Sequence, residues 1–325
     1  MHRMRWYAVL LCVSGCGLGG APGMDPPSPS YAPWTMVVLP DTQIYTSHYP
    51  EIWAAQSHWI AEHGPELGIR LVVQVGDVTD GNTPIEWQRA KAGFDEIEAV
   101  ASLVVVPGNH DYDIGQQRVS GLTAYWPVAH VAGLPTFGGL YEPDRTDNHY
   151  QRFEIDGQSW LVLGLEWAPR PAVLDWAADV LDREPADHVI VATHAYLYSD
   201  NRRYDWARWK EHQRWNPHSY PSSIWPEVSD GEELWQRVIA LHGHVDLVVS
   251  GHVAVDGVGR ATSKAADGHR VHEVLQDYQG NAHGGDGDLR LFTFRGNDIE
   301  VRTYSPWLDR FRTDSSNSFA LPWLP

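Results

Sequence analysis

Residues 70–77 read RLVVQVGD and residues 102–111 read SLVVVPGNHD, and these two stretches decide the fold. Each is a short apolar run, rich in β-branched residues, that stops at a glycine followed by polar residues. Runs of this kind are typical of strands buried on both faces of a sheet. Comparable runs cover residues 35–39, 188–192 and 245–250, and amphipathic stretches at helical spacing lie at 52–60, 87–97 and 173–181. Strands that alternate with helices predict an α/β sheet.

Three other regions predict antiparallel pairs of strands. Asp156-Gly157 joins two strand-like runs between residues 150 and 165, and this dipeptide is a strong hairpin signal. Similar turns occur at Ala266-Asp267-Gly268 and at Arg295-Gly296-Asn297. The chain therefore mixes βαβ units with hairpins. Two packed sheets covered by helices accommodate both patterns.

Polar residues of metal-ligand type follow five of the predicted strands, at the end where open α/β sheets place their ligands. A single Asp or His after a strand is more often a turn residue or a helix cap than a ligand. Five strands that end this way favour one shared site. Carboxylate, amide and imidazole groups suit Mn, Fe or Zn. The residues are Asp41 and Gln43, Asp77, Asn109 and His110, His194, and His252.

These strand ends carry a resemblance to a known family. Asp41-Thr-Gln43, Gly76-Asp77-Val-Thr-Asp80, Gly108-Asn109-His110-Asp111, Thr193-His194 and Gly251-His252 resemble the signature of the calcineurin-like metallophosphoesterases. The resemblance spans residues 36–256, and weaker similarity to one bacterial subgroup continues through residues 275–279 and 303–306. It implies a four-layer α/β/β/α sandwich, in which two mixed β-sheets are flanked by helices.

The resemblance also implies a role for each motif residue. Asp77 would bridge two divalent metal ions, expected to be Mn, Fe or Zn. The first ion would be bound by Asp41 and Gln43, and the second by Asn109, His194 and His252. His110 would protonate the leaving-group oxygen or stabilise the charge that develops there. Asp80 would accept a hydrogen bond from His110 and fix its orientation; the alternative is that Asp80 caps the turn at Gly81-Asn82.

Two positions depart from the family pattern. Members usually have His where this chain has Gln43, and a second His where this chain has Ala254. Both departures change residues that bind the first metal in the family. The first ion would then be held loosely, with water or Asp256 in place of a side chain, or the site would work with a single ion.

The predicted function is metal-dependent hydrolysis of a phosphate monoester, diester or anhydride by metal-bound hydroxide. The expected substrate is a phosphorylated small molecule, a nucleotide or a lipid head group. The alternative is a catalytically weak or silent surface lipoprotein of the same fold that binds glycan or a protein partner through a Trp-rich segment. That segment contains Trp206, Trp209, Trp215 and Trp225 among several Arg and Lys residues, and it either overhangs the metals or only packs onto the body.

Charge and the N-terminal residues indicate location. The chain has 24 Lys and Arg against 42 Asp and Glu, a net charge of −18, which disfavours binding to a nucleic-acid duplex. Residues 1–15 are typical of a secretory signal, and Val13-Ser14-Gly15-Cys16 resembles a bacterial lipobox. A plain signal peptide or a short buried helix are the alternatives. We expect lipidation at Cys16, a flexible tether over 16–33 rich in Gly, Pro and Ser, and the phosphoesterase domain over 34–325. The protein would thus be anchored by lipid in the bacterial cell envelope, outside the cytoplasm.

Overall fold

The computed structural model describes residues 32–113, 118–254 and 257–323. The expected signal peptide, Cys16, nearly all of the expected tether and Asp256 lie outside these residues. Within them, no helix combines the length and the apolar character needed to cross a bilayer.

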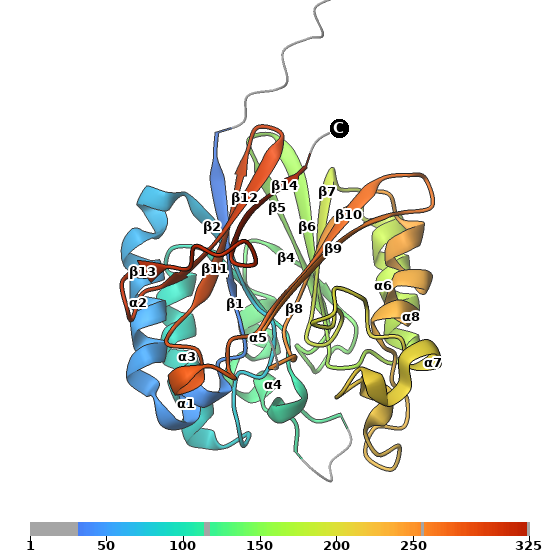
Figure 1. Cartoon of the computed structure of the whole chain (residues 1–325), viewed down its shortest axis with the longest axis horizontal. Helices are drawn as coiled ribbons and strands as arrows, with labels where there is room; N and C mark the ends of the chain where they lie inside the picture. Colours follow the sequence, from blue (N-terminus) through green and yellow to red (C-terminus); the bar gives the residue numbers. More distant parts are fainter. Residues whose placement is uncertain (1–31, 114–117, 255–256, 324–325) are drawn as a thin grey trace, which may run out of the picture. The chain divides into compact units, whose positions relative to one another are not determined.

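Two mixed seven-stranded sheets form the centre of the fold (Figure 1). The first has the order β13-β12-β11-β1-β2-β3, with β14 also paired to β12. Its strands are β1 Trp34–Leu39, β2 Ile69–Gln74, β3 Ser102–Val105, β11 Leu289–Arg295, β12 Asp298–Ser305, β13 Arg310–Phe311 and β14 Ser318–Pro322. The second has the order β4-β5-β6-β7-β8-β10-β9. Its strands are β4 Phe137–Leu140, β5 His149–Ile155, β6 Gln158–Leu165, β7 His188–Thr193, β8 Val245–Ser250, β9 Val258–Lys264 and β10 Arg270–Gln276.

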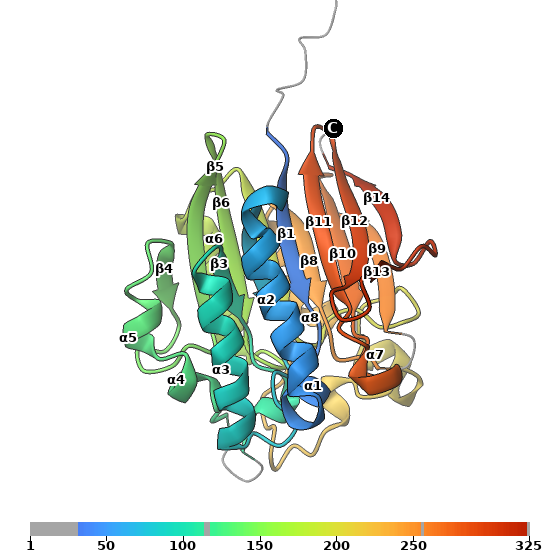
Figure 2. The same cartoon turned by 90° about the vertical axis from the view of Figure 1, so that its left-hand side faces the viewer.

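Helices cover the outer face of each sheet, as Figures 1 and 2 show for α2 and α3 on one side and for α6 and α8 on the other. On the first sheet lie α1 Gln43–His48, α2 Pro50–Leu67 and α3 Pro84–Glu98, and on the second lie α6 Pro171–Arg183 and α8 Gly231–Arg237. Shorter helices are α4 Leu122–Tyr125, α5 Val128–Val131 and α7 Trp206–Trp209. The expected four-layer α/β/β/α sandwich is therefore confirmed.

Apolar side chains fill all three interfaces of the sandwich. Alternate residues of β1 face opposite ways: Met36 and Val38 pack between the sheets, while Val37 and Leu39 pack against the helices. Each fully buried aliphatic side chain contributes about 1.5–3 kcal/mol. The stability that this core provides can offset the energetic cost of buried polar groups and strained backbone at one edge of the fold.

The predicted strands and turns lie where the sequence pattern placed them. Strands β1, β2 and β3 are mutually parallel, as are β7 and β8, so their carboxyl ends share one edge of the sandwich. The hairpins at Asp156-Gly157, at Asp267-Gly268 and at Gly296-Asn297 join β5 to β6, β9 to β10 and β11 to β12, all antiparallel. The residues that follow the five parallel strands are thereby gathered at one edge.

The buried carboxyl group of Asp147 should make stability depend on pH. Burial raises its pKa to about 7, and the hydrogen bond from Ser120 Oγ, 2.5 Å from Asp147 Oδ1, only partly offsets this effect. The folded protein therefore keeps a proton that the unfolded chain has lost, so stability falls as pH rises from about 4 through 7.

The variant Asp147→Asn should be more stable than wild type by about 2–4 kcal/mol at pH 8, and this difference should shrink to about 1 kcal/mol at pH 4.5, because a shift of one pKa unit is worth about 1.4 kcal/mol. Urea denaturation at several pH values measures this difference. Parallel curves for the two proteins across this range would contradict it.

Candidate metal centre

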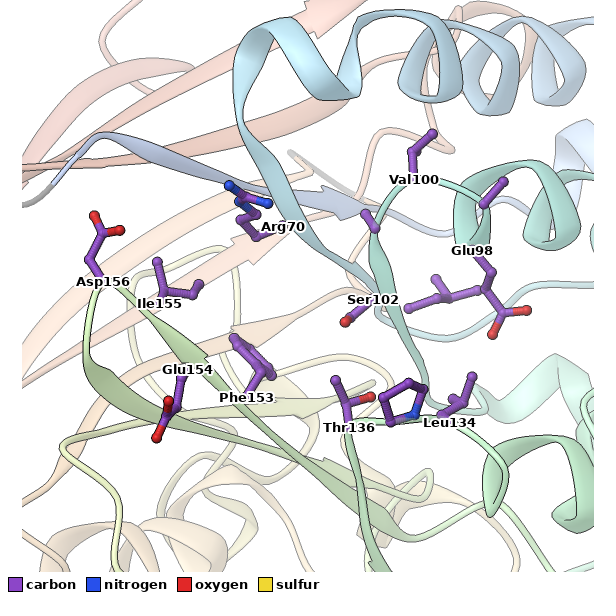
Figure 3. A pocket seen from close by; sticks show the side chains of 14 residues that line it. Arg70, Glu98, Val100, Ser102, Leu134, Thr136, Phe153, Glu154, Ile155 and Asp156 are labelled. Atoms are coloured by element: carbon purple, nitrogen blue, oxygen red, sulfur yellow. The ribbon is translucent and has the colours of Figure 1, made fainter.

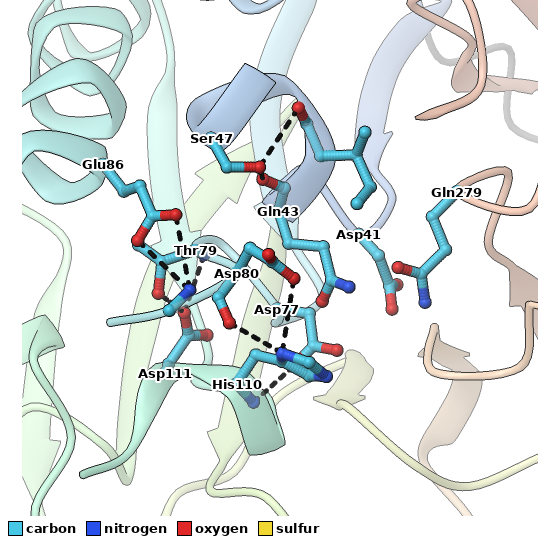
Figure 4. A network of polar contacts seen from close by, with 12 residues as sticks. Asp41, Gln43, Ser47, Asp77, Thr79, Asp80, Glu86, His110, Asp111 and Gln279 are labelled. Carbon is cyan, nitrogen blue, oxygen red and sulfur yellow. Dashed lines mark hydrogen bonds and ion pairs between the residues drawn. The ribbon is translucent and has the colours of Figure 1, made fainter. Parts of the chain in front are cut away.

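The shared edge brings together side chains from both sheets. Asp41, Asp77 and Asn109 follow β1, β2 and β3, while His194 and His252 follow β7 and β8. One ligand-type atom from each of Asp77, His194 and His252 lies within 4.8 Å of the others, and all three residues are buried. Figure 4 shows Asp41, Gln43, Asp77 and His110 gathered in this region. The structure thus brings together residues from strand ends that are far apart in the sequence.

The two imidazoles face each other through one ring nitrogen each. His194 Nδ1 lies 2.8 Å from the carbonyl oxygen of Val75, and His252 Nε2 lies 2.9 Å from that of Trp215. A carbonyl oxygen only accepts, so these nitrogens carry the protons in the neutral rings. The remaining nitrogens, His194 Nε2 and His252 Nδ1, lie 3.1 Å apart. Two lone pairs this close need a shared proton or a cation, and a ring N–H bonded to a carbonyl is the usual arrangement of a metal-ligating His.

Carboxylates surround this pair. Asp77 Oδ1 lies 3.3 Å and Asp41 Oδ2 lies 4.0 Å from His194 Nε2. The backbone N–H of His252 donates to both carboxylate oxygens of Asp41, at 3.2 and 3.0 Å, which fixes the side chain of Asp41. The site is therefore a compact set of buried oxygen and nitrogen acceptors.

Two amide oxygens of the site have no hydrogen-bond partner. Gln43 Oε1 and Asn109 Oδ1 are buried, and no donor among the described residues reaches them. A buried acceptor without a partner costs about 1–3 kcal/mol. Gln43 and Asn109 are two of the residues for which the sequence predicts a ligand role. Their orphaned oxygens fit a divalent cation, which would take the place of the missing donor.

The pKa values follow from burial and from mutual charge. Burial, together with the charges of Asp277 and Asp77, raises the pKa of Asp41 well above its usual range. Burial also opposes ionisation of Asp77, but the neighbouring His194 outweighs it and lowers the pKa of Asp77 to about 2. Burial and the charge of His194 lower the pKa of His252 to about 3. No Lys or Arg lines the 210 Å³ cavity over Asp77 and His252 in the described part of the chain. Positive charge in this cavity must therefore come from a proton on His194 or His110, whose pKa values are, despite burial, both raised by Asp77, or from a bound cation.

Backbone strain is concentrated at the same place. Asp77 has φ 47° and His252 has φ 78°, both in the left-handed region that costs an ordinary residue about 1–3 kcal/mol. A Cβ on Gly108 would lie 2.1 Å from Asp77 N, and one on Gly251 would lie 2.1 Å from Asp41 Oδ1. These two glycines therefore let the loops approach closely enough to present Asp77 and Asp41.

Asp111 ties two of the ligand-bearing loops together, a role that the sequence analysis did not assign. Its buried carboxylate accepts hydrogen bonds from the N–H groups of Val78, Thr79 and Gly108, at 3.1, 2.8 and 2.8 Å, and from Thr79 Oγ1. Asp111 thus holds the loop that carries Asp77 against the loop that carries Asn109. The motif Gly-Asn-His-Asp contained this residue, but only the fold shows where its carboxylate points.

His110 is held by the main chain of Asp80. Its Nδ1 lies 2.8 Å from the main-chain carbonyl oxygen of Asp80 and 3.6 Å from the carboxylate oxygen Oδ1, and Figure 4 shows the pair. Asp80 thus accepts from His110, and it does so chiefly through its main-chain oxygen. The turn geometry of the loop brings the carbonyl group closer to the ring. Burial opposes protonation, but Asp77 and this carbonyl raise the pKa of His110, and its other nitrogen is left for a ligand.

Asp277 and Gln279 are site residues for which the sequence carried little signal. Both follow β10, and Gln279 lines the 210 Å³ cavity together with Asp77, His252 and Ala254. Asp277 Oδ2 accepts a hydrogen bond from Gln279 Nε2 at 3.2 Å, which leaves the Gln279 amide oxygen unused by that contact. Figure 4 shows the Gln279 side chain directed to the region of Asp41. The signal available beforehand was the weak similarity over residues 275–279.

The Trp-rich segment splits into two parts. Trp215 lines the cavity over Asp77, and Trp225 lines an adjoining cavity beside His110. Its cations stack on the tryptophans: Arg202 and Arg208 on Trp209 at 4.6 and 4.7 Å, Lys210 on Trp206, and Arg214 on Trp215 at 4.6 Å. Among the described residues, no cation of this segment lines either cavity. Aromatic groups, rather than Arg or Lys, therefore face the site.

A larger cavity of about 590 Å³ lies away from this centre (Figure 3). Its lining includes Arg70 and Ser102, at the amino-terminal ends of β2 and β3, and Asp156 at the β5–β6 turn. Asp77 and Asn109 follow the opposite ends of β2 and β3. Size alone does not mark the functional site, because this cavity gathers none of the candidate ligands.

The chain is similar in sequence and in structure to known proteins. A family model described as calcineurin-like phosphoesterase matches residues 35–256. The uncharacterized protein YvnB of Bacillus subtilis (strain 168) is 29% identical over 287 residues, which cover 85% of this chain and 20% of that protein. This chain thus spans about a fifth of the length of YvnB. Purple acid phosphatase PPD1 from yellow lupin (Lupinus luteus) is similar in structure, with a TM-score of 0.52 and 13% identity over 91% of this chain and 55% of that chain. A 5'-nucleotidase precursor from Thermus thermophilus gives a TM-score of 0.46 and 14% identity, covering 90% of this chain and 55% of that one.

Proposed function

Because the chain belongs to the calcineurin-like phosphoesterase family, we propose that it hydrolyses a phosphate monoester, diester or anhydride with the help of divalent metal ions. One observation carries this proposal. His194 Nε2 and His252 Nδ1 lie 3.1 Å apart, beside two carboxylates and two amide oxygens without partners. Divalent cations would satisfy these groups together. Mn, Fe or Zn suits this mixture of donors.

The proposed ligands divide between two positions. Asp41 and Gln43 would hold the first ion, Asn109, His194 and His252 would hold the second, and Asp77 would serve both. Ala254 offers the first ion nothing, and we propose that the amide oxygen of Gln279 serves in its place. The position of Gln279 in the same cavity, with its amide nitrogen occupied by Asp277, supports this assignment.

The protein side chains have separate tasks in the proposed reaction. Bound divalent ions would acidify a water molecule and offset negative charge on the phosphoryl oxygens. His110 is oriented by the Asp80 carbonyl and donates a proton from its other nitrogen to the leaving-group oxygen. Trp215 and Tyr220 narrow the cavity above Asp77 and so limit the entry of bulk water.

The proposal is tested by assaying the purified protein on p-nitrophenyl phosphate and on its bis-ester. Metal is first removed with a chelator, and Mn, Zn, Fe or Mg is then added back. Hydrolysis that is lost with the metal and restored by at least one of these ions supports the proposal. No hydrolysis above the uncatalysed rate with any ion would sink it.

A second candidate is a silent binding protein of the same fold. Ala254, which lacks the usual ligand, and the aromatic residues Trp215, Tyr220 and Trp225 at the cavities favour it. Binding of glycan or a protein partner by a protein that is inactive with every metal would support this second reading.

We also propose that the enzyme acts outside the cytoplasm of a bacterial cell, anchored by lipid at Cys16. The apolar residues 6–13 and the sequence Val13-Ser14-Gly15-Cys16 support this part of the proposal. Cys16→Ala should move the protein out of the membrane fraction. Equal membrane association of the two forms would contradict the anchor.

A further inference from the structure

A second cavity, of about 430 Å³, opens beside His110. We call it the leaving-group cavity; it is lined chiefly by Asp80, Tyr112, Asp113, Tyr220, Ile224 and Trp225. It adjoins the cavity over Asp77, because Asn109, His110 and Tyr220 line both. Its volume lies within the range of small-molecule sites, about 300–1,000 Å³.

The position of this cavity identifies what it would hold. His110 donates its proton to the leaving-group oxygen in the proposed reaction, so the group released on cleavage lies on the His110 side of the phosphorus. The leaving-group cavity begins at that side. A substrate that places its phosphoryl group over Asp77 therefore extends its leaving group between Tyr112, Tyr220, Ile224 and Trp225.

The apolar wall of the cavity is fixed rather than adaptable. The rings of Tyr112 and Trp225 meet edge to face, with centroids 5.2 Å apart and an interplanar angle of 88°. Arg118 stacks on Trp225 at 5.1 Å, while its guanidinium donates to the carbonyl groups of Trp167, Ala168 and Glu227. Arg118 is thereby occupied, and it does not line the cavity.

Apart from His110 at its inner end, the charged residues of the cavity are all acidic. Asp80 and Asp113 line it, and Asp113 Oδ1 accepts a hydrogen bond from Asn82 Nδ2 at 2.7 Å. No Lys or Arg among the described residues lines it. A leaving group that carries a second phosphate or a carboxylate would meet two carboxylates, and the one cationic side chain, His110, is engaged at the oxygen that is released. Aromatic faces beside carboxylates instead suit an uncharged or cationic group.

We propose that the enzyme selects phosphoesters whose leaving group is an uncharged or cationic organic group with an apolar face, and discriminates against anionic leaving groups. This inference rests on the proposed phosphoesterase activity. It adds a substrate class to that activity, and it assigns the choice to the leaving-group cavity rather than to the metal centre.

The test uses three substrates of nearly equal shape: phenyl phosphate, 3-carboxyphenyl phosphate and 3-(trimethylammonio)phenyl phosphate, each also as its methyl diester. The quantity measured is the ratio of kcat/KM for the carboxyphenyl substrate to kcat/KM for the phenyl substrate. Comparing this ratio between protein variants cancels the intrinsic reactivity of the esters.

Two variants should raise that ratio. Asp113→Asn removes one carboxylate, keeps an acceptor for Asn82, and should raise the ratio by about threefold; Ile224→Arg adds a cation and should raise it by about tenfold. Both should lower the corresponding ratio for the trimethylammonio substrate. Ile224→Met, the matched uncharged control, should leave both ratios within about twofold of wild type.

The outcomes distinguish a wrong role for the leaving-group cavity from a wrong enzymatic activity. Active variants whose ratios equal that of wild type would overturn the assignment of the cavity while leaving the phosphoesterase activity standing. A metal-loaded wild type that hydrolyses none of the substrates would overturn the proposed function and this inference together.

Discussion

Replacing Asp77 with asparagine should lower kcat for phosphoester hydrolysis by about 10³-fold or more, since a metal centre supplies several kcal/mol of transition-state stabilisation. Divalent-metal affinity should fall as well. The Asp77 carboxylate lies 3.3 Å from His194 and accepts the backbone N–H of His110 at 2.9 Å, so it joins the two halves of the centre. An amide in its place retains the shape but removes the negative charge.

Asparagine is the appropriate substitution because of the backbone. Asp77 has φ 47°, and Asn tolerates this left-handed conformation better than most residues do. The variant should therefore fold, which separates loss of function from loss of structure. Far-ultraviolet circular dichroism, isothermal titration with Mn²⁺ or Zn²⁺, and steady-state kinetics measure the three quantities.

Asp80→Asn is the matched control on the same loop. The main-chain carbonyl of Asp80 remains in place to hold His110, so this variant should lose less than about tenfold in kcat. Similar losses in Asp77→Asn and Asp80→Asn would contradict the division of roles. Full activity in Asp77→Asn would remove Asp77 from the centre altogether.

His110→Gln should lower kcat by about 10²–10³-fold while metal affinity stays close to that of wild type, as expected for loss of a general acid. His110 contributes a proton rather than a ligand in the proposed reaction. Its backbone N–H, which donates to Asp77, is unchanged by the substitution. The substitution therefore leaves all of the proposed metal ligands unchanged.

The leaving group provides a sharper test of this role. A nitrophenolate departs without protonation, whereas an alkoxide needs a proton, so the loss in His110→Gln should be much larger for an alkyl ester than for a nitrophenyl ester. Steady-state kinetics on both esters measures this contrast. Equal losses on the two esters would instead assign His110 a purely electrostatic role.

The strands and the gathering of the site follow from the sequence for a physical reason. A strand buried on both faces is continuously apolar, so the point where polarity returns, at Asp41, Asp77 and His194, marks its end. Parallel neighbours then bring those ends to one edge. The hairpins were predictable in the same local way, because Asp156-Gly157 and its counterparts suit the conformation of tight turns.

What the sequence did not show depends on contacts between distant segments. The position of Gln279 in the cavity depends on how the loop after β10 lies against the loop after β8. Asp111 acts through hydrogen bonds to three separate backbone positions. The atom of Asp80 that holds His110 is a main-chain oxygen, which has no sequence signature. Residue identity also cannot tell that Arg202 and Arg208 stack on Trp209 instead of facing the substrate.

The number of divalent ions bound per chain tests the central claim most directly. Elemental analysis of the purified wild-type protein, loaded with Mn or Zn and freed of excess metal by gel filtration, gives this number. The convergence of Asp41, Asp77, Asn109, His194 and His252 predicts at least one ion per folded chain. A folded protein that retains no stoichiometric ion under these conditions would contradict it.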